Sequence, residues 1–269
     1  MVDNLNKLID EVEEEIKPEF KKINKICEEN SRKVLTSFQR NHISEMHFNS
    51  TSGYGYGDVG RDAIEKIFAE VLGAEDALVR SQFISGTHAL TVCLFGLLRP
   101  GDTVLSINGK PYDTLDSVIG ICENNSSLKS YGVKYEQIEL IGNEFDYEGI
   151  RKRVSRNDIK LVIMQRSRGY AIRKSLELQN IKKVVEEIRK ENKDVIIMCD
   201  NCYGEFVDTE EPLNYGVDVI VRITYKKFRR RIGTKRRIYC WKKRTCGIMC
   251  RKINSPRSWK RSRAKPWYK

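Results

Sequence analysis

Short apolar segments alternate with helical patterns through the middle of this chain, and this alternation limits the folds open to it. Five segments have the length and composition of strands: Ala77–Val79, Thr103–Ser106, Lys160–Met164, Val195–Cys199 and Val217–Val221. Four segments show helical spacing: Arg61–Leu72, His88–Leu98, Thr114–Ile121 and Ile181–Asn192. Short apolar strands separated by helices are typical of a parallel sheet that is covered on both faces. The sequence therefore predicts an α/β domain with a mostly parallel sheet.

The first fifty residues predict a helical arm. Apolar residues from Leu5 to Ile16 recur at helical spacing, with acidic residues between them. The pattern is interrupted near Pro18, because proline cannot donate the helical backbone hydrogen bond, and it resumes to about Glu29. We expect residues 1–50 to form this arm and residues 51–221 to form the α/β domain.

The segment Arg222–Lys269 differs in composition from the rest of the 269-residue chain. It holds 20 of the 49 Lys and Arg residues, all three Trp and no Asp or Glu, so residues 1–221 have 29 basic and 37 acidic residues. A block of like charge with interleaved aromatic residues is typical of a solvated arm that attracts nucleic-acid phosphate and stacks on bases. Nucleic acid is therefore one candidate partner of this basic tail.

A shifted reading frame is the other interpretation of the basic tail. AT-rich codons can be assigned to Arg222–Arg244 so that reading one nucleotide later gives Gly-Ser-Leu-Ile-Lys-Asn-Leu-Gly-Gly-Gly at its start. Clustered arginines become glycines, and one lysine precedes a flexible turn, a pattern that enzymes use around a reactive amine. We favour this interpretation, in which residues 222–269 are a frameshift product and the α/β domain is incomplete at its C-terminus.

Composition also limits the location of the protein. The N-terminus is charged, and no segment approaches the run of about eighteen apolar residues that spans a membrane, so we expect a cytoplasmic protein without a membrane partner. The eight cysteines fit reduced thiols better than a disulfide framework. Cys199 and Cys202 have metal-ligand spacing, but residues 1–221 offer no second Cys pair, and we expect no metal.

The turn Ser85-Gly86-Thr87-His88 lies between a predicted strand and an apolar helix. Gly86 would let the backbone approach a phosphate, and the helix N-terminus would offer N–H groups and the positive end of its dipole. A serine N-cap followed by a glycine in the turn would give the same sequence, so both interpretations stay open. We expect His88 to cap or pack rather than to act as a base.

Asp200 directly follows the strand Val195–Cys199, at the sheet edge where parallel sheets bind ligands. Its carboxylate could hold a proton on a heterocyclic nitrogen, as a pyridinium requires, or it could simply form a turn. Tyr112 follows the strand Thr103–Ser106 in a loop, where it could stack on an aromatic ring or merely pack.

Arginines near two loops allow further interpretations. In the cluster Tyr54-Gly-Tyr56-x4-Arg61, the guanidinium could grip a phosphate with two hydrogen bonds, or it could be a surface group in the first helical turn. In the segment Gln165–Tyr170, either arginine could face solvent. Glu205 and Asp208 could form an acid pair, but we expect a solvated loop or helix face.

The order of these segments resembles that of the Cys/Met-metabolism branch of pyridoxal-phosphate enzymes, and within it the methionine gamma-lyase-like group often called aluminium resistance proteins. The resemblance covers about Leu35–Val221, through SGYGYGDVGRD, SQFISGTHAL, GKPYDTL, VIMQRSRGY and CDNCYGEF followed by GVDVIV. It implies an aminotransferase-like large domain of fold type I and pyridoxal 5'-phosphate held as a Schiff base on a lysine. It also implies a small amino-acid substrate and a homo-oligomer with active sites at subunit interfaces.

The resemblance implies roles for individual residues in the cofactor site. Gly86 and Thr87 would bind the cofactor phosphate, Tyr112 would stack on the pyridine ring, and Asp200 would pair with the ring nitrogen. These four residues come from three separate motifs of the sequence.

Other implied roles involve the neighbouring subunit and the basic tail. Tyr56 and Arg61 would reach the phosphate bound in the neighbouring subunit. The Schiff-base lysine falls at Lys226, although the Ser-Leu-Ile-Lys-Asn type of string expected around it appears only in the shifted frame. The small C-terminal domain that helps this family to bind the substrate carboxylate is absent from residues 222–269. We therefore expect a carbon–sulfur lyase of the β- or γ-eliminating type, with little or no turnover by this chain.

Overall fold

A seven-stranded sheet forms the centre of the computed structural model, which describes residues 2–51, 57–80, 82–223 and 237–241. The strand order is β1-β7-β6-β5-β4-β2-β3. The strands are β1 (Asp76–Arg80), β2 (Thr103–Ser106), β3 (Lys134–Gln137), β4 (Ile159–Gln165), β5 (Ile196–Asp200), β6 (Val219–Ile223) and β7 (Arg237–Trp241). Neighbours from β6 to β3 run parallel, whereas β7 is antiparallel to both β1 and β6. The predicted mostly parallel sheet is confirmed.

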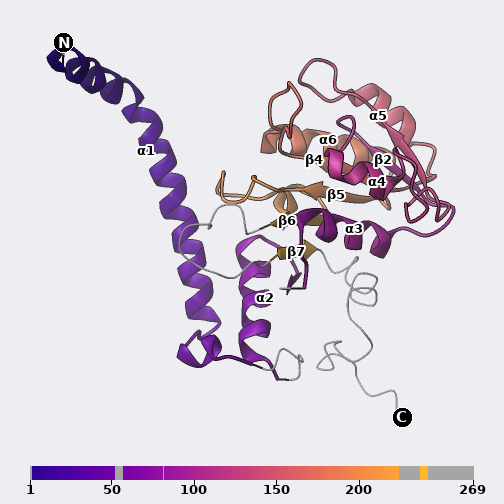
Figure 1. Cartoon of the computed structure of the whole chain (residues 1–269), viewed down its shortest axis with the longest axis horizontal. Coiled ribbons are helices and arrows are strands. Elements are labelled where there is room, and N and C mark those ends of the chain that lie inside the picture. Colours follow the sequence, from indigo (N-terminus) through magenta and orange to yellow (C-terminus); the bar gives the residue numbers. More distant parts are fainter. Residues whose placement is uncertain (1, 52–56, 81, 224–236, 242–269) are drawn as a thin grey trace.

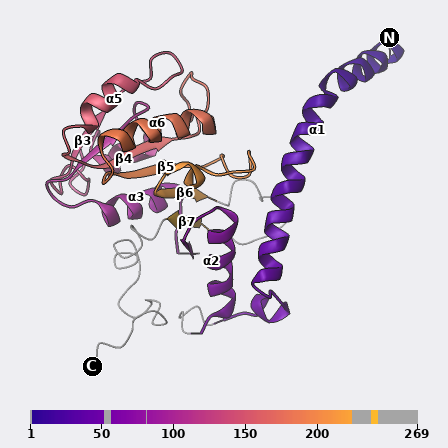
Figure 2. The same cartoon turned by 180° about the vertical axis from the view of Figure 1, so that it is seen from behind.

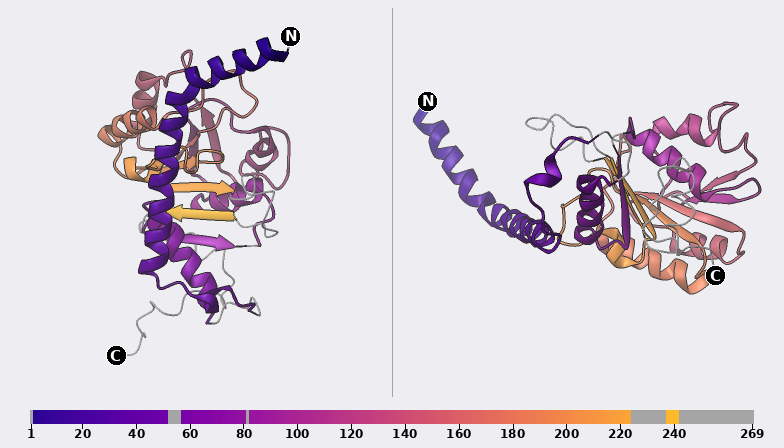
Figure 3. Two further views of the ribbon diagram at one scale, coloured as in Figure 1. Left: turned by 90° about the vertical axis from the view of Figure 1, so that its left-hand side faces the viewer. Right: turned by 90° about the horizontal axis from the view of Figure 1, so that it is seen from below.

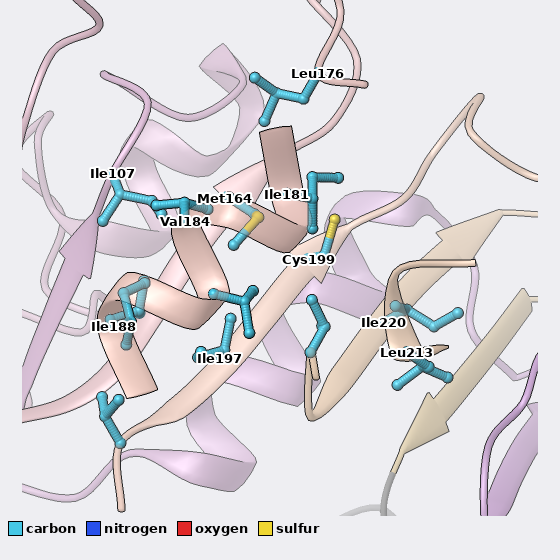
Figure 4. Packing of buried hydrophobic residues seen from close by; sticks show 14 of the residues in the cluster. Ile107, Met164, Leu176, Ile181, Val184, Ile188, Ile197, Cys199, Leu213 and Ile220 are labelled. Atoms are coloured by element: carbon cyan, nitrogen blue, oxygen red, sulfur yellow. The ribbon is translucent and has the colours of Figure 1, made fainter. Parts of the chain in front are cut away.

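Helices cover both faces of the sheet (Figures 1 and 2). One face packs against α2 (Val59–Val71), α5 (Tyr147–Val154) and α6 (Leu178–Glu191), and the other against α3 (Gly86–Leu97) and α4 (Asp116–Ile119). Side chains alternate along β5, so that Ile197 and Cys199 join the first core and Ile196 and Met198 the second. Figure 4 shows the first core, in which Ile181, Val184 and Ile188 of α6 lie against the sheet.

The N-terminal arm is one long helix, α1 (Val2–Arg40), followed by the 3-10 helix η1 (Glu45–Phe48). The predicted interruption near Pro18 is wrong, because α1 continues through this residue. A proline removes one backbone hydrogen bond from a helix, and here the ion pairs Lys17–Glu14 and Lys22–Glu19 lie on either side of it. The first half of α1 projects from the body, as Figure 1 shows.

Among the α-helices and strands of the described ranges, three were not predicted from the sequence: β3, α5 and β7. β3 lies at the sheet edge and consists of partly exposed polar residues, so it lacks an apolar run. β7 belongs to the basic tail, and its backbone lies between β1 and β6, with Cys240 opposite both Ala77 and Ile220 (Figure 3). The interpretation of the whole tail as a free arm is therefore wrong for residues 237–241.

Short 3-10 helices link the larger elements, namely η2 (Asp113–Leu115) before α4 and η3 (Pro212–Tyr215) before β6. Among the helices of the described ranges, none is both long enough and apolar enough to span a membrane.

Candidate functional site

A cleft of about 520 Å³ opens at the carboxyl ends of β4 and β5. Its walls come from the N-terminus of α3, the loop after β2, and the loops that follow β4 and β5. Four of the predicted site residues line this cleft: Gly86, Thr87, Tyr112 and Asp200. Residues that are far apart in the sequence therefore meet at the sheet edge where parallel strands end.

The turn formed by residues 85–88 lies at the N-terminus of α3. Ser85 is the N-cap, and its hydroxyl accepts the backbone N–H of His88 at 2.9 Å. The Thr87 hydroxyl lies 2.7 Å from the Thr114 hydroxyl in the same cleft. Because the first N–H groups of a helix have no partner within the helix, this end of α3 suits an anion. The N-cap interpretation is thus correct for Ser85 and compatible with a phosphate site.

His88 packs within this turn. Its Nδ1 accepts the backbone N–H of Ile84 at 3.3 Å, and its ring meets Phe83 edge to face with ring centroids 6.0 Å apart. These contacts agree with the expected capping and packing role.

Tyr112 presents an aromatic ring to the cleft. Its backbone N–H donates to Oε1 of Gln165 at 2.8 Å, which holds the loop after β2 against the end of β4. The ring stacks on Tyr170, with centroids 5.5 Å apart and planes 26° apart. The hydrogen bond with Tyr170 raises the pKa of Tyr112 to about 12, so the phenol stays neutral at physiological pH.

Asp200 places a buried carboxylate in the cleft. It is the last residue of β5 and is 9% exposed, and its Oδ1 accepts the backbone N–H of Cys202 at 3.0 Å. Cys202 lines the cleft as well, whereas Cys199 packs in the hydrophobic core. Within the described ranges, no group of three or more His, Cys, Asp or Glu side chains could hold a metal ion.

Arg61 lies elsewhere on the same chain. It belongs to the first turn of α2, where its backbone N–H donates to Asp58 Oδ1 at 2.9 Å, and it lines a separate cleft of about 420 Å³ with His47. The structure therefore does not bring Arg61 to the Asp200 cleft of its own chain. Tyr56 and Lys226 lie outside the described residues, so their roles stay predictions.

The two arginines after β4 have different surroundings. Arg166 is only 4% exposed, and it donates to two backbone carbonyls, to the Asn201 side chain at 3.2 Å and to Asp208 at 2.5 Å. Arg168 is exposed and lines the cleft. The expected solvated face is wrong for Glu205, which is 4% exposed. The Asp208 side chain is 43% exposed and pairs with Arg166. The acceptors on Asn201, Gly204 and Asp208 lie more than thirty residues from Arg166 in the chain, so the local sequence did not reveal them.

Gln165 was missed as a site residue by the sequence reasoning. It lines the cleft and bonds to the loops on both sides of it, donating from Nε2 to the carbonyl of Ser167 at 3.0 Å. The available signal was its position, since it directly follows the apolar run Lys160–Met164 as Asp200 follows its own strand.

The chain is similar to several known proteins in sequence or in structure. YnbB of Bacillus subtilis (strain 168) is 42% identical over 219 residues, which cover 80% of this chain and 52% of YnbB. A carbon–sulfur lyase involved in aluminium resistance from Clostridium novyi NT is 41% identical, with a TM-score of 0.87 over 94% of this chain and 61% of that chain. A proposed cystathionine beta-lyase involved in aluminium resistance from Clostridium acetobutylicum is 39% identical, with a TM-score of 0.88 over the same shares.

A more distant structure shows the fold alone. The pyridoxal-5'-phosphate-dependent protein YhfS from Escherichia coli has a TM-score of 0.63 at 17% identity, over 83% of this chain and 57% of that chain. The implied aminotransferase-like architecture of fold type I is thereby confirmed. This chain spans about half the length of the curated relative YnbB. The family model described as methionine gamma-lyase matches residues 5–232, and the chain belongs to that family.

Proposed function

We propose that this chain carries the cofactor site of a pyridoxal-phosphate-dependent lyase that cleaves a carbon–sulfur bond of an amino acid by β- or γ-elimination. The observation that supports this proposal is the convergence of Gly86, Thr87, Tyr112 and Asp200 on one cleft. Family membership adds the lyase class, because the C. novyi relative bears that description.

The chemistry of the cleft fits the cofactor at three points. The N-terminus of α3 with Thr87 offers donors for a phosphate, Tyr112 offers an aromatic wall, and Asp200 offers a carboxylate for a protonated ring nitrogen. The volume of about 520 Å³ falls within the range of about 300–1,000 Å³ that small-molecule sites occupy. Each of these groups would hold a different part of the cofactor.

The residues of the chain would divide the work between binding and proton control. When bound, pyridoxal phosphate supplies an electron sink for the carbanion that follows loss of the substrate α-proton. Asp200 would keep a proton on the ring nitrogen, and its burial strengthens that charge-assisted hydrogen bond. Tyr112 would orient the ring, and the end of α3 would anchor the phosphate. The amine at position 226 would accept the substrate α-proton.

We also propose that this chain turns over slowly or not at all. Lys226 is flanked by Tyr225 and Lys227 and followed by Arg229–Arg231, where the shifted frame has isoleucine, asparagine and three glycines. Bulky cationic neighbours remove the flexibility that a lysine needs when it alternates between cofactor and substrate.

Assembly and location complete the proposal. Arg61 lies outside the cleft of its own chain, and the resemblance assigns it to the site of a neighbouring subunit. We therefore propose a homo-oligomer, located in the cytoplasm.

Binding of pyridoxal phosphate by the full chain tests the proposed site. Titration followed by induced circular dichroism in the cofactor absorption band should show saturable binding, and Asp200→Ala should weaken that binding by about tenfold or more. Asp194→Ala is the matched control, because Asp194 is an exposed carboxylate just before β5, whereas Asp200 ends the same strand. Absence of saturable binding, or equal binding by wild type and Asp200→Ala, would overturn the assignment. Rapid release of thiol and keto acid from an amino-acid thioether would contradict the proposed loss of turnover.

A further inference from the structure

Gln165 joins two loops that line the cleft. It is the last residue of β4, and its Cα lies opposite that of Asp200 in the β4–β5 register. Oε1 of its side chain accepts the backbone N–H of Tyr112 at 2.8 Å, and Nε2 donates to the carbonyl of Ser167 at 3.0 Å. One amide group therefore spans from the loop after β2 to the loop after β4.

The backbone of Gln165 is itself held in place. Its N–H donates to Oδ1 of Asn108 at 3.1 Å, and Nδ2 of Asn108 donates back to its carbonyl at 2.9 Å. Asn108 is 8% exposed, so this reciprocal pair is shielded from competing water. Arg173 donates to the carbonyls of Gln165 and Ser167 at 3.0 and 2.6 Å. The amide of Gln165 thus extends from a fixed point.

Gly169 lets the loop after β4 close on the same contact. It has a φ of +59°, and a Cβ at this position would lie 3.0 Å from Nε2 of Gln165 and 3.3 Å from Cδ2 of Tyr112. The glycine therefore packs against both the amide that holds Tyr112 and the ring of Tyr112 itself. The position of the Tyr112 ring therefore depends on contacts from the end of β4 and from the loop that follows it.

We propose that Gln165 is the positioning residue for Tyr112, and that it sets the place of the aromatic wall relative to Asp200. This assignment rests on the proposed function for its meaning, because Tyr112 orients a cofactor only if the cleft binds one. The contact itself exists in the unloaded protein and can be tested there.

Hydrogen exchange in the unloaded full chain tests the contact without a cofactor. In Gln165→Met, which keeps the side-chain length but has no amide, the backbone amide of Tyr112 should exchange about tenfold faster or more. Gln137→Met is the matched control. Gln137 ends β3 as Gln165 ends β4, and its side chain also makes two hydrogen bonds, but it is exposed and bonds to Tyr135 and Glu139. The control should leave exchange at Tyr112 unchanged.

A double-mutant cycle then tests whether Gln165 acts through Tyr112. Pyridoxal phosphate binding should weaken about tenfold in Gln165→Met when Tyr112 is present, and should change less than about twofold in the Tyr112→Ala background. Gln165→Glu keeps an acceptor for the Tyr112 N–H, so its binding should lie closer to wild type than that of Gln165→Met. A residue that only stabilised the fold would weaken binding equally in both backgrounds.

The possible outcomes separate this inference from the proposed function. Unchanged exchange at Tyr112 in Gln165→Met, or equal loss of binding in both backgrounds, would overturn the positioning role. If exchange changes as expected but wild type binds no pyridoxal phosphate, the role of Gln165 in holding Tyr112 stands and the proposed cofactor site fails.

Discussion

Two arginines are buried to a similar extent near the carboxyl ends of β4 and β6, yet they differ in their partners. Arg166, just after β4, is 4% exposed and donates to four acceptors, including the carboxylate of Asp208. Arg222, in β6, is 1% exposed. Its Nε and Nη1 atoms have no hydrogen-bond partner among the described residues. Its guanidinium lies 5.1 and 5.5 Å from the ring centroids of Phe68 and Phe206.

This difference bears on the proposed frameshift after Val221. A buried cation with donors that lack acceptors among the described residues loses part of its hydration without replacing it, although contacts with aromatic rings offset part of that loss. Arg166 belongs to the segment in which the sequence pattern, the fold and the side-chain partners agree, whereas Arg222 is the first residue of the basic tail. The shifted frame has glycine at position 222, which would bury no charge. The burial of Arg222 therefore supports the proposed frameshift after Val221.

Removing the well-partnered arginine should have the largest effect. Arg166→Met should lower the free energy of unfolding by about 3–5 kcal/mol, because it leaves buried acceptors without their donor. Urea denaturation would measure the change. Arg168→Met is the control on an exposed neighbour and should stay within about 0.5 kcal/mol of wild type. An Arg166→Met protein as stable as wild type would remove the basis of the comparison.

Removing Arg222 should act in the opposite direction. Arg222→Met should raise the free energy of unfolding by about 1–4 kcal/mol, since a methionine of similar length fills the space without a buried charge whose Nε and Nη1 lack acceptors among the described residues. The same denaturation experiment applies. If Arg222→Met is instead less stable than wild type, Arg222 is a native part of the core and the structural argument for a frameshift is wrong.

A third arginine sharpens the comparison by having exposed partners. Hydrogen bonds from Arg153 lower the pKa of Glu136 and of Asp158, whose side chains are 40% and 55% exposed. Because solvent screens such pairs, Arg153→Met should lower the free energy of unfolding by no more than about 1 kcal/mol at neutral pH.

The pH dependence of this small effect has a definite sign. Carboxyl groups whose pKa is lowered on folding stabilise the protein above their ordinary pKa, and that contribution is lost as the pH falls through the lowered values. The difference between wild type and Arg153→Met should therefore shrink as the pH falls below about 4. Denaturation curves across this range would show it, and a difference that grows in acid would contradict the assigned cause.

The elements that sequence reasoning found share one property, which is a continuous apolar segment of ordinary length. β1, β2, β4, β5 and β6 all have it, and the polar end residue Asp200 of β5 pointed to the cleft. β3 was missed because a polar edge strand has no such run, and β7 because its residues lie in a cationic tail. The amino-acid composition of a segment does not reveal which strands it will pair with.

A site residue could be predicted where its position in the local sequence indicated its role. Asp200 follows a buried strand, and Gly86 opens a helix, so each could be located from its local sequence. The role of Gln165 depends on hydrogen bonds to two loops, one of them more than fifty residues away in the chain, and local sequence does not contain it. The burial of Arg222 was unpredictable for another reason, because its charge indicates an exposed residue.

Sequencing the gene across the codons for Ile220–Lys227, and for several hundred nucleotides beyond, tests the central claim that sequence and fold agree to Val221 and part at Arg222. We predict one extra base and an alternative frame that stays open, encoding Gly-Ser-Leu-Ile-Lys-Asn and further lyase sequence. Confirmation of the present frame, with stop codons soon interrupting the alternative, would contradict this account and make the basic tail a native part of the protein.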